Sequence, residues 1–305
     1  MDLRIKIGGT VFKNPVWSAS GTFGSGREFT EFIDVSEAGA IVAKTVTLEA
    51  REGNPPQRIV ETPSGMLNSI GLENKGVEFF KQENYPFLKS VKTRVVISVA
   101  GFSAEDFAEC AERASEKNFP DAIEVNLSCP NVKHGLTRGR LIAQDAGATR
   151  RTVARVRKKT GCLVIAKLTP NVTDIAEIAR AAEDGGADAV SLVNTYLGMA
   201  VDAYKMKPVL GNIVGGLSGP AIKPMALRAV WEVYKAVKVP VIGMGGIMSG
   251  TDAAEFMLCG ARAVQVGTAN LADPAAHNRI LREFREYLDE NKIKKASDLT
   301  GRLQV

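Results

Sequence analysis

The residues best suited to chemistry stand where a short, mostly apolar strand ends. Residues 122–127 read as a buried strand, and Asn126, Ser128 and Cys129 come at its end, just before Pro130. Because proline cannot donate to a sheet and restricts the residue before it, the strand must stop there and Cys129 must begin a loop. A thiol in that place could serve as a general base or as a nucleophile.

Polar and small residues follow the other apolar runs of the chain in the same way. Together with Asn126 they are Ser20, Lys44, Thr45, Ser98, Lys167, Asn194, Thr195, Gly245, Gly246, Gly267 and Thr268. The set is rich in amides but has no pair of carboxylates and no histidine, which argues against glycosidase and metal-hydrolase chemistry and predicts no metal site. It fits a flat heterocycle with hydrogen-bonding groups, together with an anionic group.

Two lysines, Lys44 and Lys167, each end an apolar run. A lysine in such a place ordinarily extends its ammonium group into solvent. Two of them at strand ends, with no carboxylate beside either, favour contact with a ligand instead.

Three glycine-bearing segments predict a phosphate site: residues 215–220, Gly245-Gly246 and Gly267-Thr268. Glycine lets a ligand approach the backbone closely, and backbone amides after the last two strands of a parallel barrel commonly hold phosphate. Since no adenylate fingerprint is present, a mononucleotide cofactor is the simplest interpretation. In the loop 65–74, Asn68 and Asn74 are equally compatible with ligand binding and with structural Asx-turns.

The elements that must position these residues repeat as strand, turn and helix. Helical periodicity is clearest over 173–184, 221–237 and 274–290. The apolar runs are residues 15–19, 40–44, 95–100, 122–127, 163–168, 189–194, 239–244 and 263–266. Such a series predicts a (β/α)8 TIM barrel, a single domain over residues 1–305. The alternative, an open doubly wound sheet, would want a phosphate loop after its first strand, where none is seen.

Two segments are too long for simple crossovers, residues 46–94 after the second strand and 195–238 after the sixth. Insertions after barrel strands usually build the C-terminal face, where ligands bind. We therefore expect both to contribute to the site.

Composition narrows the class of protein. The chain has 305 residues, 45% of them hydrophobic and 24% charged, with a net charge of +5 that is scattered rather than gathered among aromatics. This predicts no nucleic-acid partner. No apolar run approaches the roughly 18 residues of a membrane span, and residues 1–7 alternate like a strand rather than a signal peptide. The four cysteines lack zinc spacing, so we expect a cytoplasmic protein.

Taken together, these motifs resemble the dihydroorotate dehydrogenase family, specifically family 1. The likeness runs from Asn14-Pro15-Val16 to Gly267-Thr268-Ala269, and a cysteine at the base position is typical of family 1. Within family 1, residues 68–74 and 194–199 are similar to the class B catalytic subunit. The most specific segments are Asn68-Ser69-Ile70-Gly71-Leu72, Asn126-Leu127-Ser128-Cys129-Pro130-Asn131, Asn194-Thr195, Gly216-Leu217-Ser218-Gly219-Pro220 and Gly245-Gly246-Ile247.

The resemblance implies FMN-dependent oxidation of (S)-dihydroorotate to orotate in de novo pyrimidine (UMP) biosynthesis. Cys129 would be the general base, and residues 131–140 a lid. One FMN per chain would bind to Ser20, Lys44, Thr45, Ser98, Asn126, Lys167, Val193, Gly219, Gly245, Gly246, Gly267 and Thr268. Ser98 replaces an Asn that contacts the flavin in many relatives, and its shorter side chain makes a weaker contact. The substrate would bind to Lys44, Asn68, Ser69, Ile70, Gly71, Leu72, Asn126, Asn194 and Thr195.

The resemblance also implies partners. Class B chains form homodimers that pair, as heterotetramers, with a subunit that carries FAD and a [2Fe-2S] cluster and passes electrons to NAD. The alternatives are a class A-like enzyme that uses fumarate, a related flavin barrel that reduces another pyrimidine, a phosphate-binding aldolase or isomerase, and a non-catalytic scaffold.

Overall fold

Eight parallel strands form a barrel in the computed structural model, which describes residues 1–128 and 142–304. From β4 (Ala40–Val46) onward each strand pairs with the next in chain order, and the last strand, β16 (Ala261–Val266), pairs with β3 (Val16–Ser18). Between β3 and β4 the backbone amide of Val42 donates to Ser18 Oγ at 2.9 Å. The strands are β3 (Val16–Ser18), β4 (Ala40–Val46), β7 (Arg94–Val99), β8 (Ala122–Asn126), β9 (Leu163–Lys167), β10 (Ala189–Leu192), β15 (Val241–Met244) and β16 (Ala261–Val266). The predicted TIM barrel is confirmed.

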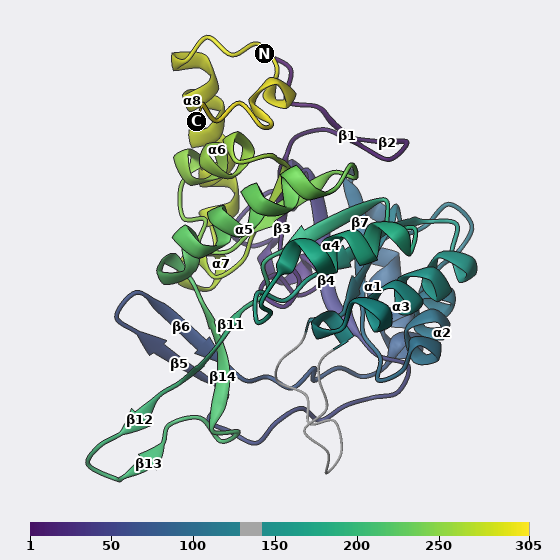
Figure 1. Ribbon diagram of the computed structural model, residues 1–305, viewed down its shortest axis with the longest axis vertical. Coiled ribbons are helices and arrows are strands. Elements are labelled where there is room, and N and C mark those ends of the chain that lie inside the picture. The colour runs from purple at the N-terminus through teal and green to yellow at the C-terminus, as the bar shows by residue number, and fades with distance from the viewer. Residues whose placement is uncertain (129–141, 305) are drawn as a thin grey trace.

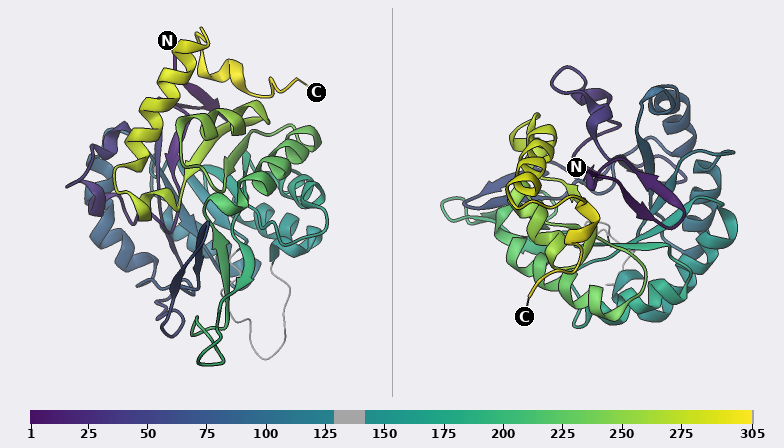
Figure 2. Two further views of the ribbon diagram at one scale, coloured as in Figure 1. Left: turned by 90° about the vertical axis from the view of Figure 1, so that its left-hand side faces the viewer. Right: turned by 90° about the horizontal axis from the view of Figure 1, so that it is seen from above.

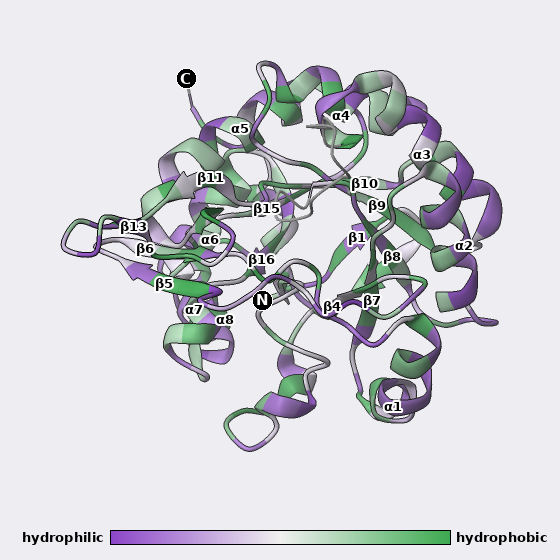
Figure 3. Cartoon of the chain, turned by 90° about the horizontal axis from the view of Figure 1, so that it is seen from below, coloured by the Kyte–Doolittle hydropathy of each residue, from purple (hydrophilic) through white to green (hydrophobic). Residues whose placement is uncertain are grey.

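Helices surround the strands as a ring (Figure 2, right; Figure 3). The predicted helices 173–184, 221–237 and 274–290 correspond to α4, α5 and α8. The α-helices are α1 (Val77–Ser90), α2 (Ala104–Ala114), α3 (Ala146–Lys159), α4 (Ile175–Asp184), α5 (Lys223–Ala236), α6 (Gly250–Leu258), α7 (Ala269–Ala272) and α8 (Ala276–Glu290). Short 3-10 helices are η1 (Arg27–Phe29), η2 (Val35–Glu37), η3 (Ile142–Gln144), η4 (Pro220–Ile222) and η5 (Ala296–Leu299).

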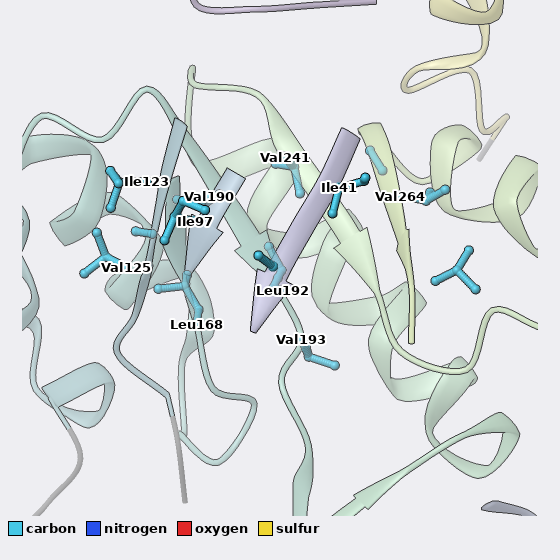
Figure 4. Packing of buried hydrophobic residues seen from close by; sticks show 14 of the residues in the cluster. Ile41, Ile97, Ile123, Val125, Leu168, Val190, Leu192, Val193, Val241 and Val264 are labelled. Atoms are coloured by element: carbon cyan, nitrogen blue, oxygen red, sulfur yellow. The ribbon is translucent and has the colours of Figure 1, made fainter. Parts of the chain in front are cut away.

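Alternation along the strands separates two apolar layers. Ile123 and Val125 of β8 and Val190 of β10 belong to the large cluster that packs the barrel against its helices (Figure 4). Ala122 of β8 and Ile165 of β9 face the other side of their strands and belong to a second cluster inside the barrel. Because side chains of a strand alternate between faces, each barrel strand serves both layers.

The two long insertions meet in a separate antiparallel sheet. Its strands are β5 (Ile59–Thr62) and β6 (Gly65–Asn68) from the first insertion and β11 (Tyr196–Met199) and β14 (Val214–Ser218) from the second. They lie in the order β11-β14-β6-β5, and Asn68 pairs with Gly216. A small hairpin of β12 (Val201–Asp202) and β13 (Lys207–Pro208) extends beyond this sheet (Figure 1).

The opposite end of the molecule carries both described chain ends (Figure 1). There β1 (Ile5–Ile7) and β2 (Thr10–Phe12) form a hairpin, so the strand expected within residues 1–7 is present. In the part of the chain that the structure describes, no helix has both the length and the apolarity needed to span a bilayer.

Candidate active site

A large cavity lies at the carboxyl ends of the barrel strands and extends to the insertion sheet. It contains about 1250 Å³ of space outside protein atoms, part of it open to solvent, which is ample for a cofactor and a small substrate. Most of the predicted site residues line it: Ser20, Lys44, Thr45, Asn68, Ile70, Gly71, Leu72, Asn126, Lys167, Val193, Asn194, Thr195, Gly219, Gly245, Gly246, Gly267 and Thr268.

Two predicted residues, Ser98 and Ser69, are not among the described residues that line the cavity. Ser98 is fully buried, and its hydroxyl lies 2.9 Å from Thr45 Oγ1. Ser69 is also fully buried, and its hydroxyl accepts from Asn54 Nδ2 at 3.0 Å. Both hydroxyls are directed at protein neighbours, and direct contact of Ser98 and Ser69 with a ligand stays a prediction.

The predicted base, Cys129, and the predicted lid, residues 131–140, lie outside the described residues. Their roles stay predictions. The described chain reaches Ser128 on one side of this gap and Ile142 on the other.

A continuous set of hydrogen bonds fixes the amides at the cavity wall. Asn126 Nδ2 donates to Thr45 Oγ1 at 3.3 Å, and Asn126 Oδ1 accepts from Ser128 Oγ at 3.1 Å. Asn194 Nδ2 donates to the same Ser128 hydroxyl at 2.8 Å, while its Oδ1 accepts from the backbone amide of Thr195 at 2.8 Å. Because the oxygen and the nitrogen of each amide have different neighbours, the network determines the orientation of both amide groups.

Lys167 has a carboxylate neighbour, contrary to the expectation from sequence. Its Nζ lies 3.5 Å from Glu124 Oε1 and donates to Ser20 Oγ at 3.0 Å. Glu124 stands within the run 122–127 itself, on the neighbouring strand β8, where Asn126 pairs with Lys167 in register. Side chains at alternate positions of β8 share one face, so Glu124 and Asn126 both point into the barrel.

The glycine corner is built from three loops that lie against one another. Gly219, Gly245 and Gly246 have φ values of +92°, +120° and +84°, which glycine adopts readily and other residues do not. A Cβ at Gly246 would lie 2.8 Å from the carbonyl oxygen of Gly219. Thr268 Oγ1 donates to Ser218 Oγ at 2.9 Å and so joins the last barrel loop to the insertion sheet.

An ion cluster around Lys223 lies against Gly246 of this corner. Lys223 Nζ donates to Asp252 Oδ1 at 2.6 Å and to Glu255 Oε2 at 2.8 Å, which ties α5 to α6. Burial alone would lower the pKa of Lys223, but its hydrogen bonds to these carboxylates raise it above the usual value. The Asp252 carboxylate also accepts the backbone amides of Met248 and Ser249, at 2.8 and 2.9 Å.

The structure separates the two asparagines that the sequence left equal. Asn74 is an Asx-turn residue, because its Oδ1 accepts the backbone amide of Gly76 at 2.8 Å and its Nδ2 donates to the Leu72 carbonyl at 2.7 Å. Asn68 lines the cavity, and its Nδ2 donates to the carbonyl of Gly216 in the adjacent strand at 3.3 Å.

Several residues of the site were missed in the sequence. Gln265 and Ser218 line the cavity, while Glu124 and Ser191 lie fully buried beneath it. A signal was present, because each of Glu124, Ser191 and Gln265 interrupts an apolar run at a position that alternates with outward-facing apolar residues. Polar residues placed in this way face the barrel interior.

Of the three described cysteines, Cys110 is buried in the core, and Cys162 and Cys259 are half-buried and pack against it. Burial raises the pKa of Cys110 to about 12, so its thiol is not ionised at neutral pH. Burial also raises the pKa of Cys259. Within residues 1–128 and 142–304, no group of three or more His, Cys, Asp and Glu side chains could hold a metal ion.

A family model and several known proteins match almost the whole chain. A sequence model of the dihydroorotate dehydrogenase family matches residues 2–288. The protein named "Dihydroorotate dehydrogenase B (NAD(+)), catalytic subunit" in Desulforamulus reducens is 53% identical over 301 residues, 99% of this chain and 98% of the relative. Proteins of the same name in Bacteroides thetaiotaomicron and Geobacter sulfurreducens are 50% and 51% identical over 304 residues, 100% of this chain and 99% of each relative.

These full-length similarities confirm the resemblance to the class B catalytic subunit. They also agree with the barrel that the strands form. The chain belongs to the dihydroorotate dehydrogenase family.

Proposed function

We propose that the chain oxidises (S)-dihydroorotate to orotate, with FMN bound in the cavity at the carboxyl ends of the barrel strands. The observation that carries the proposal is the convergence of Lys44, Lys167 and the amides of Asn68, Asn126 and Asn194 on one cavity that also contains the glycine corner. A flat ring with imide groups and a carboxylate, beside a phosphate-bearing cofactor, matches that combination of donors, acceptors and cations.

The donor set fits FMN. The glycine loops around Gly219, Gly245-Gly246 and Gly267 offer backbone amides without side chains in front of them, as a phosphate group requires. Lys167, with only 5% of its side chain exposed, supplies a positive charge at the inner wall. When bound, FMN supplies the acceptor for the hydride that leaves C6 of dihydroorotate.

The chain's own residues orient the substrate. Lys44 attracts the carboxylate of dihydroorotate, and the amides of Asn68, Asn126 and Asn194 bind its ring carbonyl and N–H groups. Amides that are held in one orientation by Ser128 and Thr195 favour one ring pose, which is how positioned groups lower a barrier. Lys167 offsets negative charge that develops at the cofactor during the reaction.

Cys129 is the proposed general base, and its Sγ removes the C5 proton. A thiol with an ordinary pKa of about 8.5 is mostly protonated at neutral pH. Turnover is therefore expected to rise with pH as the thiolate forms.

We infer further that the chain works beside a separate subunit that carries FAD and a [2Fe-2S] cluster and passes electrons to NAD. The support is that the relatives are named as the catalytic subunit of an NAD(+)-linked enzyme. A homodimer of this chain bound to two such subunits is the proposed assembly. The chain alone should then reduce artificial acceptors but not NAD.

The test starts with the purified chain, which should be yellow and should bleach when dihydroorotate is added without oxygen. The variant Cys129→Ala should stay yellow and bind orotate but lose most of its turnover, and Cys129→Ser should keep a trace. Normal turnover by Cys129→Ala would remove the base from the mechanism. NAD reduction by the lone chain would contradict the partner, and fumarate reduction would instead indicate a class A-like enzyme.

A further inference from the structure

Glu124 is a fully buried carboxylate at the centre of the barrel interior. Its Oε1 accepts from Ser20 Oγ at 3.2 Å and lies 3.5 Å from Lys167 Nζ. Its Oε2 accepts from Ser191 Oγ at 3.2 Å and from Gln265 Nε2 at 3.0 Å. The strands β8 and β16 are not neighbours in the sheet, so these side chains can meet only across the interior.

This carboxylate supports the cavity wall without being part of it. Three of its partners, Ser20, Lys167 and Gln265, line the cavity, whereas Glu124 is not among the described residues that do so. A buried carboxylate is costly unless charge and hydrogen bonds compensate it. Here the Lys167 ammonium, two hydroxyls and one amide supply that compensation. We therefore expect the buried carboxylate to hold its three cavity-lining partners in place.

The side-chain amide of Gln265 is oriented by Glu124. A carboxylate only accepts hydrogen bonds, so Glu124 fixes the amide of Gln265 with its nitrogen inward. Gln265 Oε1 is buried and has no hydrogen-bond partner among residues 1–128 and 142–304. Gln265 also lines the cavity, so the amide that Glu124 holds forms part of the wall against which a ligand would lie.

We propose that Glu124 is a positioning residue for the cofactor, acting through Lys167 and Gln265. It holds the ammonium group of Lys167 and the amide of Gln265 in place at the wall of the cavity. Its negative charge also offsets part of the positive field of Lys167, so the reduced cofactor is held less tightly than the lysine alone would hold it. This inference rests on the proposed function, since it assumes that a flavin occupies the cavity.

The test measures the midpoint potential of bound FMN and the dissociation constant of FMN from the apoprotein. In Glu124→Gln the negative charge is lost, so reduced FMN should gain about tenfold in binding relative to oxidised FMN, which is about 30 mV upward for a two-electron couple. Oxidised FMN should bind more weakly, because Lys167 and Gln265 lose their common partner.

The control is Asp121→Asn, which removes a carboxylate that precedes the same strand and pairs with Arg94 at 2.6 Å. Because Asp121 stands at the amino end of β8, away from the cavity, its loss should leave the potential of FMN unchanged. A potential in Glu124→Gln that equals that of the parent or of this control would overturn the inference.

Ser191→Ala keeps the test decisive if Glu124→Gln does not fold. Without the Ser191 hydroxyl the carboxylate is less neutralised, so the potential should move downward, opposite to the shift in Glu124→Gln. An unchanged or higher potential in Ser191→Ala would overturn the inference. Absence of any flavin in the parent protein would instead defeat the proposed function, so the two failures are distinguishable.

Discussion

Ser128 Oγ accepts a hydrogen bond from Asn194 Nδ2 at 2.8 Å and donates one to Asn126 Oδ1 at 3.1 Å, so one buried hydroxyl orients two cavity amides. The amides come from different strand ends, β8 and the loop after β10. Their relative placement therefore depends on a residue that does not itself line the cavity, as far as the described chain shows.

Ser128→Ala should raise the KM for dihydroorotate by about five- to tenfold, because a lost hydrogen bond costs about 1 kcal/mol and frees both amides to rotate. Steady-state kinetics with a fixed artificial acceptor measure the effect. Ser115→Ala is the matched control, since Ser115 Oγ lies 2.7 Å from Thr160 Oγ1 near the end of α2. Equal KM values in the two variants would show that Ser128 does not align the amides.

Asn68 and Asn74 should respond in opposite ways to alanine. Asn68→Ala should weaken orotate binding about tenfold and leave the melting temperature nearly unchanged, because its side chain lines the cavity. Asn74→Ala loses several hydrogen bonds of the loop, including those to Gly76 and Leu72, and should cost about 2 kcal/mol, or about 3 °C in Tm. Orotate titration and calorimetry compare the two, and the reverse pattern would contradict the assignment.

Asp252→Asn should loosen the glycine corner. Asp252 and Asp106 occupy the same place in capping boxes, at the starts of α6 and α2. Replacing either should cost about 1 kcal/mol of stability. Only Asp252 also binds Lys223 beside the corner, so only Asp252→Asn should speed the loss of FMN on dilution. Similar FMN release from both variants would separate this cluster from cofactor binding.

His277 should make the fold sensitive to acid. It is fully buried, and burial lowers its pKa from 6.5 to about 4, so the folded state keeps it neutral. Below about pH 6.5 the unfolded chain takes up a proton that the folded chain does not. The contribution of His277 to the free energy of unfolding is thus complete above pH 6.5. It falls by about 3 kcal/mol in total as the pH decreases toward 4.

Urea unfolding at pH 7 and pH 4.5, on the parent and on His277→Gln, measures this contribution. The difference in unfolding free energy between the two pH values should be smaller in the variant by about 2 kcal/mol. An equal difference in both proteins would assign the acid sensitivity to other groups.

The sequence predicted those features of the fold that depend on neighbouring residues. Apolar runs and turn residues are local, so the strands, the barrel and the positions of Lys44, Asn126, Lys167 and Asn194 at strand ends were predictable. Residues at a strand end face the same side of a parallel barrel regardless of which neighbours they meet. Resemblance to the family added the substrate and the cofactor.

Contacts between distant residues were beyond the sequence. Glu124 and Gln265 are 141 positions apart, and only closure of the barrel brings their side chains together. The same holds for Ser98, which the register of β4 and β7 directs at Thr45 rather than at the cavity. The joining of the two insertions in one sheet likewise depends on where the barrel places their ends.

The sequence by itself determined the kind of fold and the residue types at the rim, because strand periodicity and strand ends are set by neighbouring residues. Only the tertiary structure decided which rim residues face the cavity, which asparagine is structural, and that Lys167 is paired with a carboxylate. Those outcomes depend on strand register and barrel closure, which bring together side chains that are far apart along the chain.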